Sequence, residues 1–165
     1  MLVFLIYLSV GFAVTSIQRF RIPLNDYYQY RANIVLKLVD DLKDRLAPGD
    51  KIQTFFYSCD ATHALFLLKY PQATRFVFTF HLFHVIDNPY IKKLRAEFLN
   101  TLKREVPKIL LMSYETATGE QRDYDYIKQF PELYAWINEN YRLALENNEY
   151  RIYELNRVRP ISSSQ

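Results

Sequence analysis

Apolar residues recur at helical spacing in several parts of the chain. The clearest run covers residues 28–50, where an apolar residue returns every four positions, at Ile34, Leu38, Leu42 and Leu46. Similar patterns predict helices over residues 61–70, 88–106 and 131–141. Pro71 and Pro107 follow two of these stretches, as expected where a helix stops.

Other stretches are rich in β-branched, aromatic and other apolar residues, which is typical of strands. They predict five strands, over residues 51–57, 75–80, 108–114, 142–147 and 150–155. The last two are separated by Asn147 and Asn148, and asparagine tolerates the left-handed backbone of a hairpin turn.

Strands that alternate with helices favour an α/β fold. We therefore expect a three-layer α/β sandwich with a mostly parallel sheet and a C-terminal antiparallel hairpin. In that hairpin, alternate residues of 150–155 should face opposite sides of the sheet. The segment before it holds the single tryptophan, and its apolar residues share one helical face: Phe130, Leu133, Trp136 and Ile137. We expect this face to pack on the sheet rather than to form a platform for a ligand.

Residues 1–17 carry no charged side chain. A helix that crosses a bilayer needs about 20 apolar residues, with a range of roughly 17–25. We expect a membrane-anchor helix over residues 1–22, an extracytoplasmic α/β domain over 23–157 and a disordered tail over 158–165. A cleaved signal peptide is the alternative, because residues 13–16 are small enough for cleavage, although no basic residue precedes the apolar run.

The composition argues against several classes of function. A net charge of +3 on 165 residues, without a run of Lys or Arg, argues against nucleic-acid binding. A single cysteine, Cys59, leaves no intrachain disulfide and no cysteine-based zinc site, and we expect it to be a small buried side chain rather than a nucleophile. The acidic residues Asp40, Asp41 and Asp44 are interpreted as a solvated helix face.

No motif for a cofactor is found. A nucleotide-binding α/β domain needs glycine directly after its first strand, and residues 58–64 contain none. His81 and His84 are three residues apart and could share a helical face, with Asp60 and His63 as further ligands, but no supporting metal-binding pattern accompanies them. We expect no metal, no cofactor and no catalytic residue in this chain. Asp60, His81 and His84 are the candidates for substrate binding.

Three tyrosines follow the apolar N-terminus closely, at Tyr27, Tyr28 and Tyr30. They could form an aromatic belt at a membrane interface, or they could pack the first helix against the core. The sequence alone leaves both interpretations open.

A series of short motifs then occurs in a fixed order. It consists of Pro-Gly-Asp at 48–50, the set Pro71, Ala73, Arg75 and Phe76, an apolar strand over 107–112, the Trp136-containing helix over 130–141, and Tyr-Arg-Ile-Tyr-Glu at 150–154. With the apolar run before it, this series resembles the C-terminal extracytoplasmic domain of bacterial multi-span glycosyltransferases of the C type, and is similar to the dolichyl-phosphate-mannose mannosyltransferase family.

The resemblance implies transfer of a sugar from a polyprenyl-phosphate carrier on the outer side of the bacterial cytoplasmic membrane. The partners implied are the remaining membrane-spanning part of the same enzyme, the bilayer, the polyprenyl-phosphate sugar, and an acceptor glycan or protein. The family's catalytic acidic residues lie in loops between earlier membrane spans, and no residue here matches them. The chain is therefore expected to be inactive alone and to shape the acceptor side. Arg19 and Arg21 depart from the pattern, because basic residues favour the inner side.

A membrane-anchored binding or interaction module without an attached enzyme is the rival interpretation. A free hydrolase-like enzyme would need a convergent Ser or Cys site, which the sequence does not contain.

Overall fold

The computed structural model describes residues 26–56, 59–84, 87–113 and 124–156. The expected anchor over 1–22 and the expected tail over 158–165 lie outside these residues. In the part of the chain that is described, no helix is both long enough and apolar enough to cross a membrane.

The described chain alternates helices and strands. Residues 26–43 are helical, and the elements that follow are β1 (Ile52–Phe55), α2 (Cys59–Leu68), α3 (His81–His84), α4 (Pro89–Glu105), β2 (Ile109–Ser113), the 3₁₀ helix η1 (Tyr124–Gln129), α5 (Pro131–Asn140), β3 (Tyr141–Glu146) and β4 (Tyr150–Leu155). The α/β class is confirmed, as are the four predicted helices and four of the five predicted strands.

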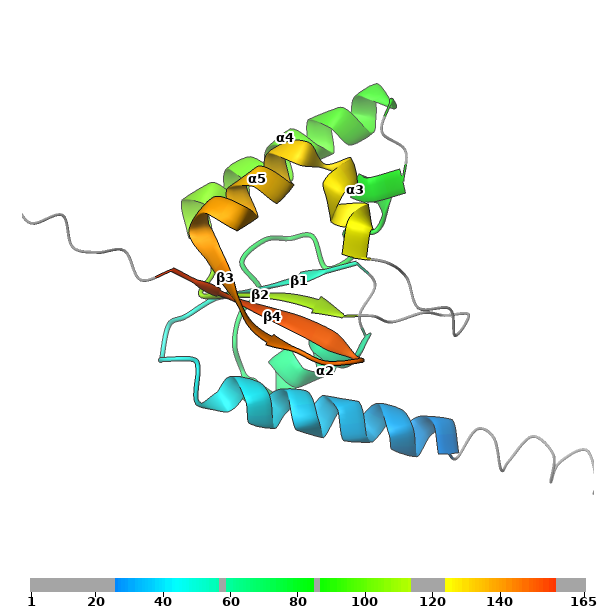
Figure 1. Ribbon diagram of the computed structural model, residues 1–165, viewed down its shortest axis with the longest axis vertical. Helices are drawn as coiled ribbons and strands as arrows, with labels where there is room; N and C mark the ends of the chain where they lie inside the picture. Colours follow the sequence, from blue (N-terminus) through cyan, green and yellow to red (C-terminus); the bar gives the residue numbers. More distant parts are fainter. Residues whose placement is uncertain (1–25, 57–58, 85–86, 114–123, 157–165) are drawn as a thin grey trace, which may run out of the picture.

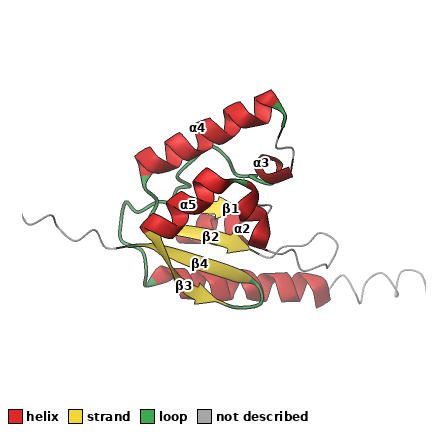
Figure 2. Cartoon of the chain, turned by 45° about the horizontal axis from the view of Figure 1, so that its top comes forward, coloured by secondary structure: helices red, strands yellow, loops and turns green. Residues whose placement is uncertain are grey.

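The four strands form one sheet in the order β1-β2-β4-β3 (Figure 2). Strands β1 and β2 are parallel, whereas β4 pairs antiparallel with both β2 and β3. The C-terminal antiparallel hairpin is confirmed. The sheet itself is mixed, so the expectation of a mostly parallel sheet is wrong.

The difference has a local cause, because the predicted strand over residues 75–80 is not a strand. The chain leaves β1 after a single bridge between Ile52 and Gln72. The carbonyl of Phe76 then accepts hydrogen bonds from the side-chain amides of Gln53 and Gln72, at 3.2 and 2.6 Å. Side chains thus satisfy a backbone group that a strand would have paired in a ladder, and they cover the edge of β1.

Apolar side chains gather in two clusters. One contains buried residues of the 26–43 helix and α2, and the other contains residues of α3, α4, η1 and α5. Figure 1 shows α4 and α5 on one side of the sheet and the 26–43 helix with α2 on the other. Along β4, Tyr150 and Ile152 belong to the first cluster, whereas Tyr153 and Leu155 pack against the second. The predicted alternation along this strand is confirmed.

The tryptophan is part of the core. Trp136 is buried, and its ring packs edge-on against Tyr141 with centroids 5.2 Å apart. Phe130, Leu133 and Ile137 are buried with it. The prediction that this helical face packs on the sheet is confirmed.

Candidate functional site

The carboxyl ends of β1 and β2 lie at the same edge of the sheet, because the two strands are parallel and Phe55 is in register with Met112. In open α/β sheets, ligands bind preferentially at this edge. Helix α2 begins here with Cys59, shortly after β1 ends. We call this region the carboxyl edge, and it is the first candidate site.

An ion pair lies at the carboxyl edge. Arg31 contacts both carboxylate oxygens of Asp60, with Nε 3.0 Å from Oδ1 and Nη2 2.9 Å from Oδ2. The two side chains are only 16% and 9% exposed. Asp60 lies in the first turn of α2, where a negative charge also stabilises the helix dipole. The pair fastens the 26–43 helix to α2, so this candidate for substrate binding has a structural task, and its binding role stays a prediction.

The histidines belong to another part of the fold. His81 is half-buried and begins α3, whose Leu82 and Phe83 pack in the cluster with α4 and α5. Asp60 instead lies on α2, whose apolar residues pack in the cluster with the 26–43 helix. The structure therefore does not gather the three candidates on one element or in one cluster. The side chain of His84 lies outside the described part.

The residues considered for a metal site and for thiol chemistry can be placed in the structure. Within the described ranges, no group of three or more His, Cys, Asp or Glu side chains is arranged to hold a metal ion. Cys59 is exposed, so the expectation that it is a buried side chain is wrong. It occupies the first position of α2, where the helix leaves its side chain in solvent.

The segment between α2 and α3 carries polar residues that the sequence analysis missed. Thr79 is fully buried; its hydroxyl accepts a hydrogen bond from the backbone N–H of Phe56 at 2.6 Å, and its own N–H donates to the Phe56 carbonyl at 3.3 Å. Phe56 has a left-handed backbone, with φ of 64°, which is rare for a bulky residue. This turn places its ring against Phe83, with centroids 5.0 Å apart.

This anchoring has a consequence for the surface. On either side of the buried Thr79, the side chains of Val77, Phe78 and Phe80 are 38–52% exposed. Only the alternation of threonine with apolar residues hinted at such an arrangement, and it was interpreted as a strand.

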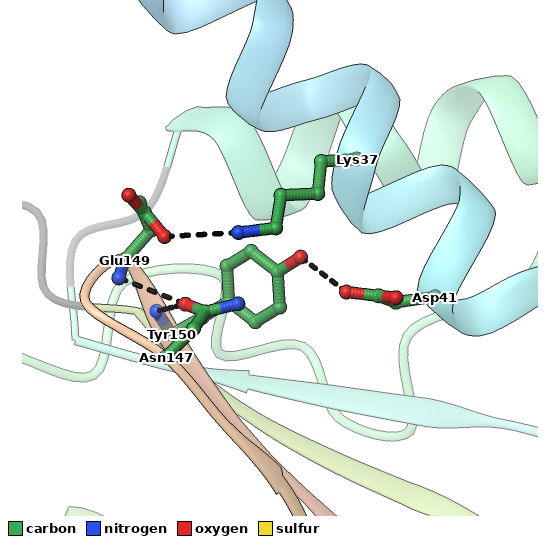
Figure 3. A network of polar contacts seen from close by, with 5 residues as sticks. All are labelled: Lys37, Asp41, Asn147, Glu149 and Tyr150. Carbon is green, nitrogen blue, oxygen red and sulfur yellow. Dashed lines mark hydrogen bonds and ion pairs between the residues drawn. The ribbon is translucent and has the colours of Figure 1, made fainter.

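A second network joins the hairpin to the 26–43 helix (Figure 3). The buried Tyr150 donates its hydroxyl hydrogen to Oδ2 of Asp41 at 2.5 Å. Lys37 pairs with Glu149 at 3.3 Å and lies 5.8 Å from the centre of the Tyr150 ring. Asn147 shapes the turn, since its Oδ1 accepts from the N–H groups of Glu149 and Tyr150. Asp41 was interpreted as part of a solvated face, and that is wrong.

Glu154 is a further fixed charge on β4. Its carboxylate accepts from Arg45 Nη1 at 2.6 Å and from Arg142 Nη2 at 2.9 Å. Burial raises the pKa of Glu154, but the two arginine hydrogen bonds outweigh this effect and hold the pKa below its usual value. Tyr150 and Glu154 both belong to the motif over 150–154, so both of these motif residues carry structural contacts.

Arg95 is a buried cation that the periodicity of α4 did not reveal. Its Nε donates to the carbonyl of Leu82 at 2.6 Å and its Nη2 to the carbonyl of Gln129 at 2.8 Å, and the guanidinium lies 4.7 Å from the Phe130 ring centre. Burial lowers its pKa, and nearby Glu132 partly offsets this. Arg95 thus ties α4 to α3 and η1.

Taken together, these ion pairs and hydrogen bonds link elements of the fold to one another. Exposed aromatic residues include Phe78 and Phe80, which follow the carboxyl edge, and Tyr27, Tyr28 and Tyr30 at the start of the described chain.

Comparisons with known proteins add a coarse likeness. No family model matches the chain, and no curated protein does either. Among solved structures, the chain is similar to the crystal structure of the C-terminal globular domain of an oligosaccharyltransferase, AglB-S2, from Archaeoglobus fulgidus. The identity is 13% and the TM-score 0.39, over 73% of this chain and 95% of that one. No residue role passes from that protein to this chain.

Proposed function

We propose that this chain is the C-terminal extracytoplasmic domain of a membrane glycosyltransferase that transfers a sugar from a polyprenyl-phosphate carrier. In this proposal the domain lacks the catalytic loops and shapes the side on which the acceptor binds. It sits outside the bacterial cytoplasmic membrane, as an α/β/α layered domain that follows an anchor over residues 1–22.

The ordered motif series carries the proposal, and the structure gives its members definite tasks. In the motif at 48–50, Gly49 has φ of 92° and the Asp50 carboxylate accepts from the N–H of Ala47 at 2.8 Å. This turn brings the chain from the 26–43 helix into β1. Glycine is favoured at such a φ because it has no Cβ.

The second motif covers the edge of β1. The carbonyl of Pro71 accepts from Ile52, and Ala73 donates back to the Ile52 carbonyl at 2.8 Å. Arg75 binds both carboxylate oxygens of Glu97 on α4, at 2.7 and 2.9 Å. These contacts fix the crossing from α2 towards α3 and α4.

The last motifs hold the C-terminal half together. The carbonyl of Pro107 accepts from the Tyr141 hydroxyl at 2.7 Å, and Tyr141 packs on Trp136. Tyr150 then fixes β4 to the 26–43 helix, and Glu154 fixes it to Arg45 in the turn that follows this helix. These motif residues maintain one fold, and the proposed activity rests on the resemblance alone.

The described residues are consistent with a supporting role. Asp60, Asp41 and Glu154 each have a positively charged or hydroxyl partner, which leaves them poorly suited to act as general acid or base. This also suits the rival function, a membrane-anchored interaction module.

The genomic sequence upstream of the Met1 codon separates the two functions. The proposal expects one continuous reading frame that encodes several membrane spans with acidic residues in the loops between them. Membranes that contain the whole product should transfer sugar from a radiolabelled polyprenyl-phosphate sugar, whereas membranes with this chain alone should not. A separate short gene with its own promoter and no such upstream region would contradict the proposal and favour the interaction module.

A further inference from the structure

The first turn and a half of the described helix belongs to neither apolar cluster of the described residues. Residues 26–30 are all exposed, and Tyr27, Tyr28 and Tyr30 are 52%, 65% and 54% exposed. In both ribbon views, this end of the helix extends past the hairpin of β3 and β4 (Figures 1 and 2). The interpretation in which the three tyrosines pack the first helix against the core is therefore wrong.

The same helix behaves differently one turn later. Ile34, Leu38 and Leu42 are buried in the cluster beneath the sheet. The helix therefore extends beyond its buried part at this end, and the three tyrosines lie on that extension. Tyr27 packs edge-on against Tyr28 with centroids 5.9 Å apart, and the Arg31 guanidinium lies 5.8 Å from the Tyr27 ring centre.

The three rings lie on one half of the helix surface. With 3.6 residues per turn, Tyr27, Tyr28 and Tyr30 are spread over roughly 160° of the helix circumference. Either a protein partner or a lipid surface with both apolar and polar character could contact all three rings.

The sequence before the helix favours a lipid surface as this contact. The apolar run ends at Ile17, and nine residues separate it from Tyr27. Even fully extended, nine residues span only about 30 Å. Arg19 and Arg21 lie in this connection and add attraction to anionic lipid.

We infer that the tyrosine cluster, defined as Tyr27, Tyr28 and Tyr30, lies in the headgroup layer of the bilayer and holds the domain close to the membrane surface. Tyrosine suits this layer because its ring is apolar while its hydroxyl remains hydrated. The inference rests on the anchor over residues 1–22 that belongs to the proposed function.

Two labelled variants test the position of the cluster. Cys59→Ser removes the only cysteine, and Tyr28→Cys or Tyr90→Cys then carries one environment-sensitive fluorophore. Tyr90 is the matched control, because it is also 65% exposed and also lies in the first turn of a helix, α4, which packs in the other cluster. The full chain is reconstituted in vesicles of phosphatidylcholine and phosphatidylglycerol in equal parts, with or without a nitroxide on the lipid headgroup.

The chain should float with the vesicles, and the nitroxide should quench the label at position 28 at least about twofold more than the label at position 90. Equal quenching in a chain that floats overturns the inference but leaves the anchor intact. A label at 28 that is shielded from aqueous iodide but not quenched by the nitroxide means that protein covers it, which also overturns the inference. A chain that does not float overturns the anchor and, with it, the inference. Unchanged Trp136 emission checks the fold, and Tyr27 or Tyr30 can carry the label instead.

Discussion

The hydroxyl of Tyr150 donates a hydrogen bond to Oδ2 of Asp41 over 2.5 Å, although 109 positions separate the two residues in the sequence. The contact links the start of β4 to the last turn of the 26–43 helix. Tyr150 is fully buried, so a lost partner could not readily be replaced by water.

We expect Tyr150→Phe to lower the free energy of unfolding by about 1–3 kcal/mol, because the lost hydrogen bond is made to a charged group. Urea unfolding of the full chain, followed by the fluorescence of the buried Trp136, measures this. Asp41→Asn and the double variant complete a cycle, in which the two losses should be less than additive. Tyr134→Phe, at an exposed ring of α5, is the control, and an equal loss in that variant would contradict the assignment.

Stability should fall at alkaline pH. Burial, followed by the hydrogen bond to Asp41, raises the pKa of Tyr150, and burial raises the pKa of Tyr141. A tyrosine whose pKa is higher in the folded state favours folding fully below the unfolded value of about 10, and this contribution is lost as the pH rises beyond it.

Measurements of the unfolding free energy between neutral pH and about pH 11 test this point. The slope should be steep in the native sequence and shallower in the double variant Tyr141→Phe/Tyr150→Phe. The same slope in both proteins would show that other groups govern the alkaline loss. Tyr134→Phe again provides the matched control, since its ring lies at the surface.

Variants of the Arg31–Asp60 pair distinguish a structural role of Asp60 from a binding role. Removal of one partner leaves the other charge poorly solvated, so Asp60→Asn or Arg31→Gln alone should cost about 1–3 kcal/mol. The double variant should recover part of this loss, and a double-mutant cycle in urea measures the coupling. If Asp60→Asn leaves stability unchanged but weakens sugar transfer in the assay that tests the proposed function, the binding role is favoured instead.

Replacement of Arg95 by lysine or by methionine should lower the free energy of unfolding. Its planar guanidinium serves the carbonyls of Leu82 and Gln129 together, and the single ammonium of lysine cannot reproduce this fork. We expect Arg95→Lys to cost about 1–2 kcal/mol and Arg95→Met more, because both carbonyls then lose a charged donor. Lys92→Met, on the exposed side of the same helix, is the control. Equal stability of the Lys92 and Arg95 variants would show that Arg95 does not stabilise the packing of α4 against α3 and η1.

The hydrophobic pattern was informative wherever packing follows one periodicity. The helical spacing from Ile34 to Leu42 and the alternation along β4 both predicted the buried faces that the structure shows. The apolar face around Trp136 was predictable for the same reason.

The failures occur where polar side chains replace regular pairing. Residues 75–80 have strand-like composition, but side-chain hydrogen bonds to residues distant in the sequence hold this segment. The Gln53 amide donates to the Phe76 carbonyl, and the Thr79 hydroxyl accepts from the N–H of Phe56. Asp41 and Arg95 were missed for a related reason. A charged residue within a periodic helix resembles a solvated one until its tertiary partner is known.

The end of α4 contains a strained residue, and its replacement should stabilise the protein. Val106 caps this helix with φ of 41° and ψ of 67°, and its N–H donates to the Leu102 carbonyl. The left-handed conformation is costly for a β-branched side chain, and Val106 is 45% exposed, so its side chain contributes little packing. We expect Val106→Gly to raise the unfolding free energy by about 0.5–1 kcal/mol, despite the entropy that glycine adds to the unfolded chain.

Val77→Gly is the matched control, because Val77 is exposed to a similar extent, at 39%, without a positive φ, and this change should destabilise the chain. Urea unfolding of both variants gives the comparison, and a loss of stability in Val106→Gly would mean that the valine side chain stabilises the helix end more than its backbone strain weakens it.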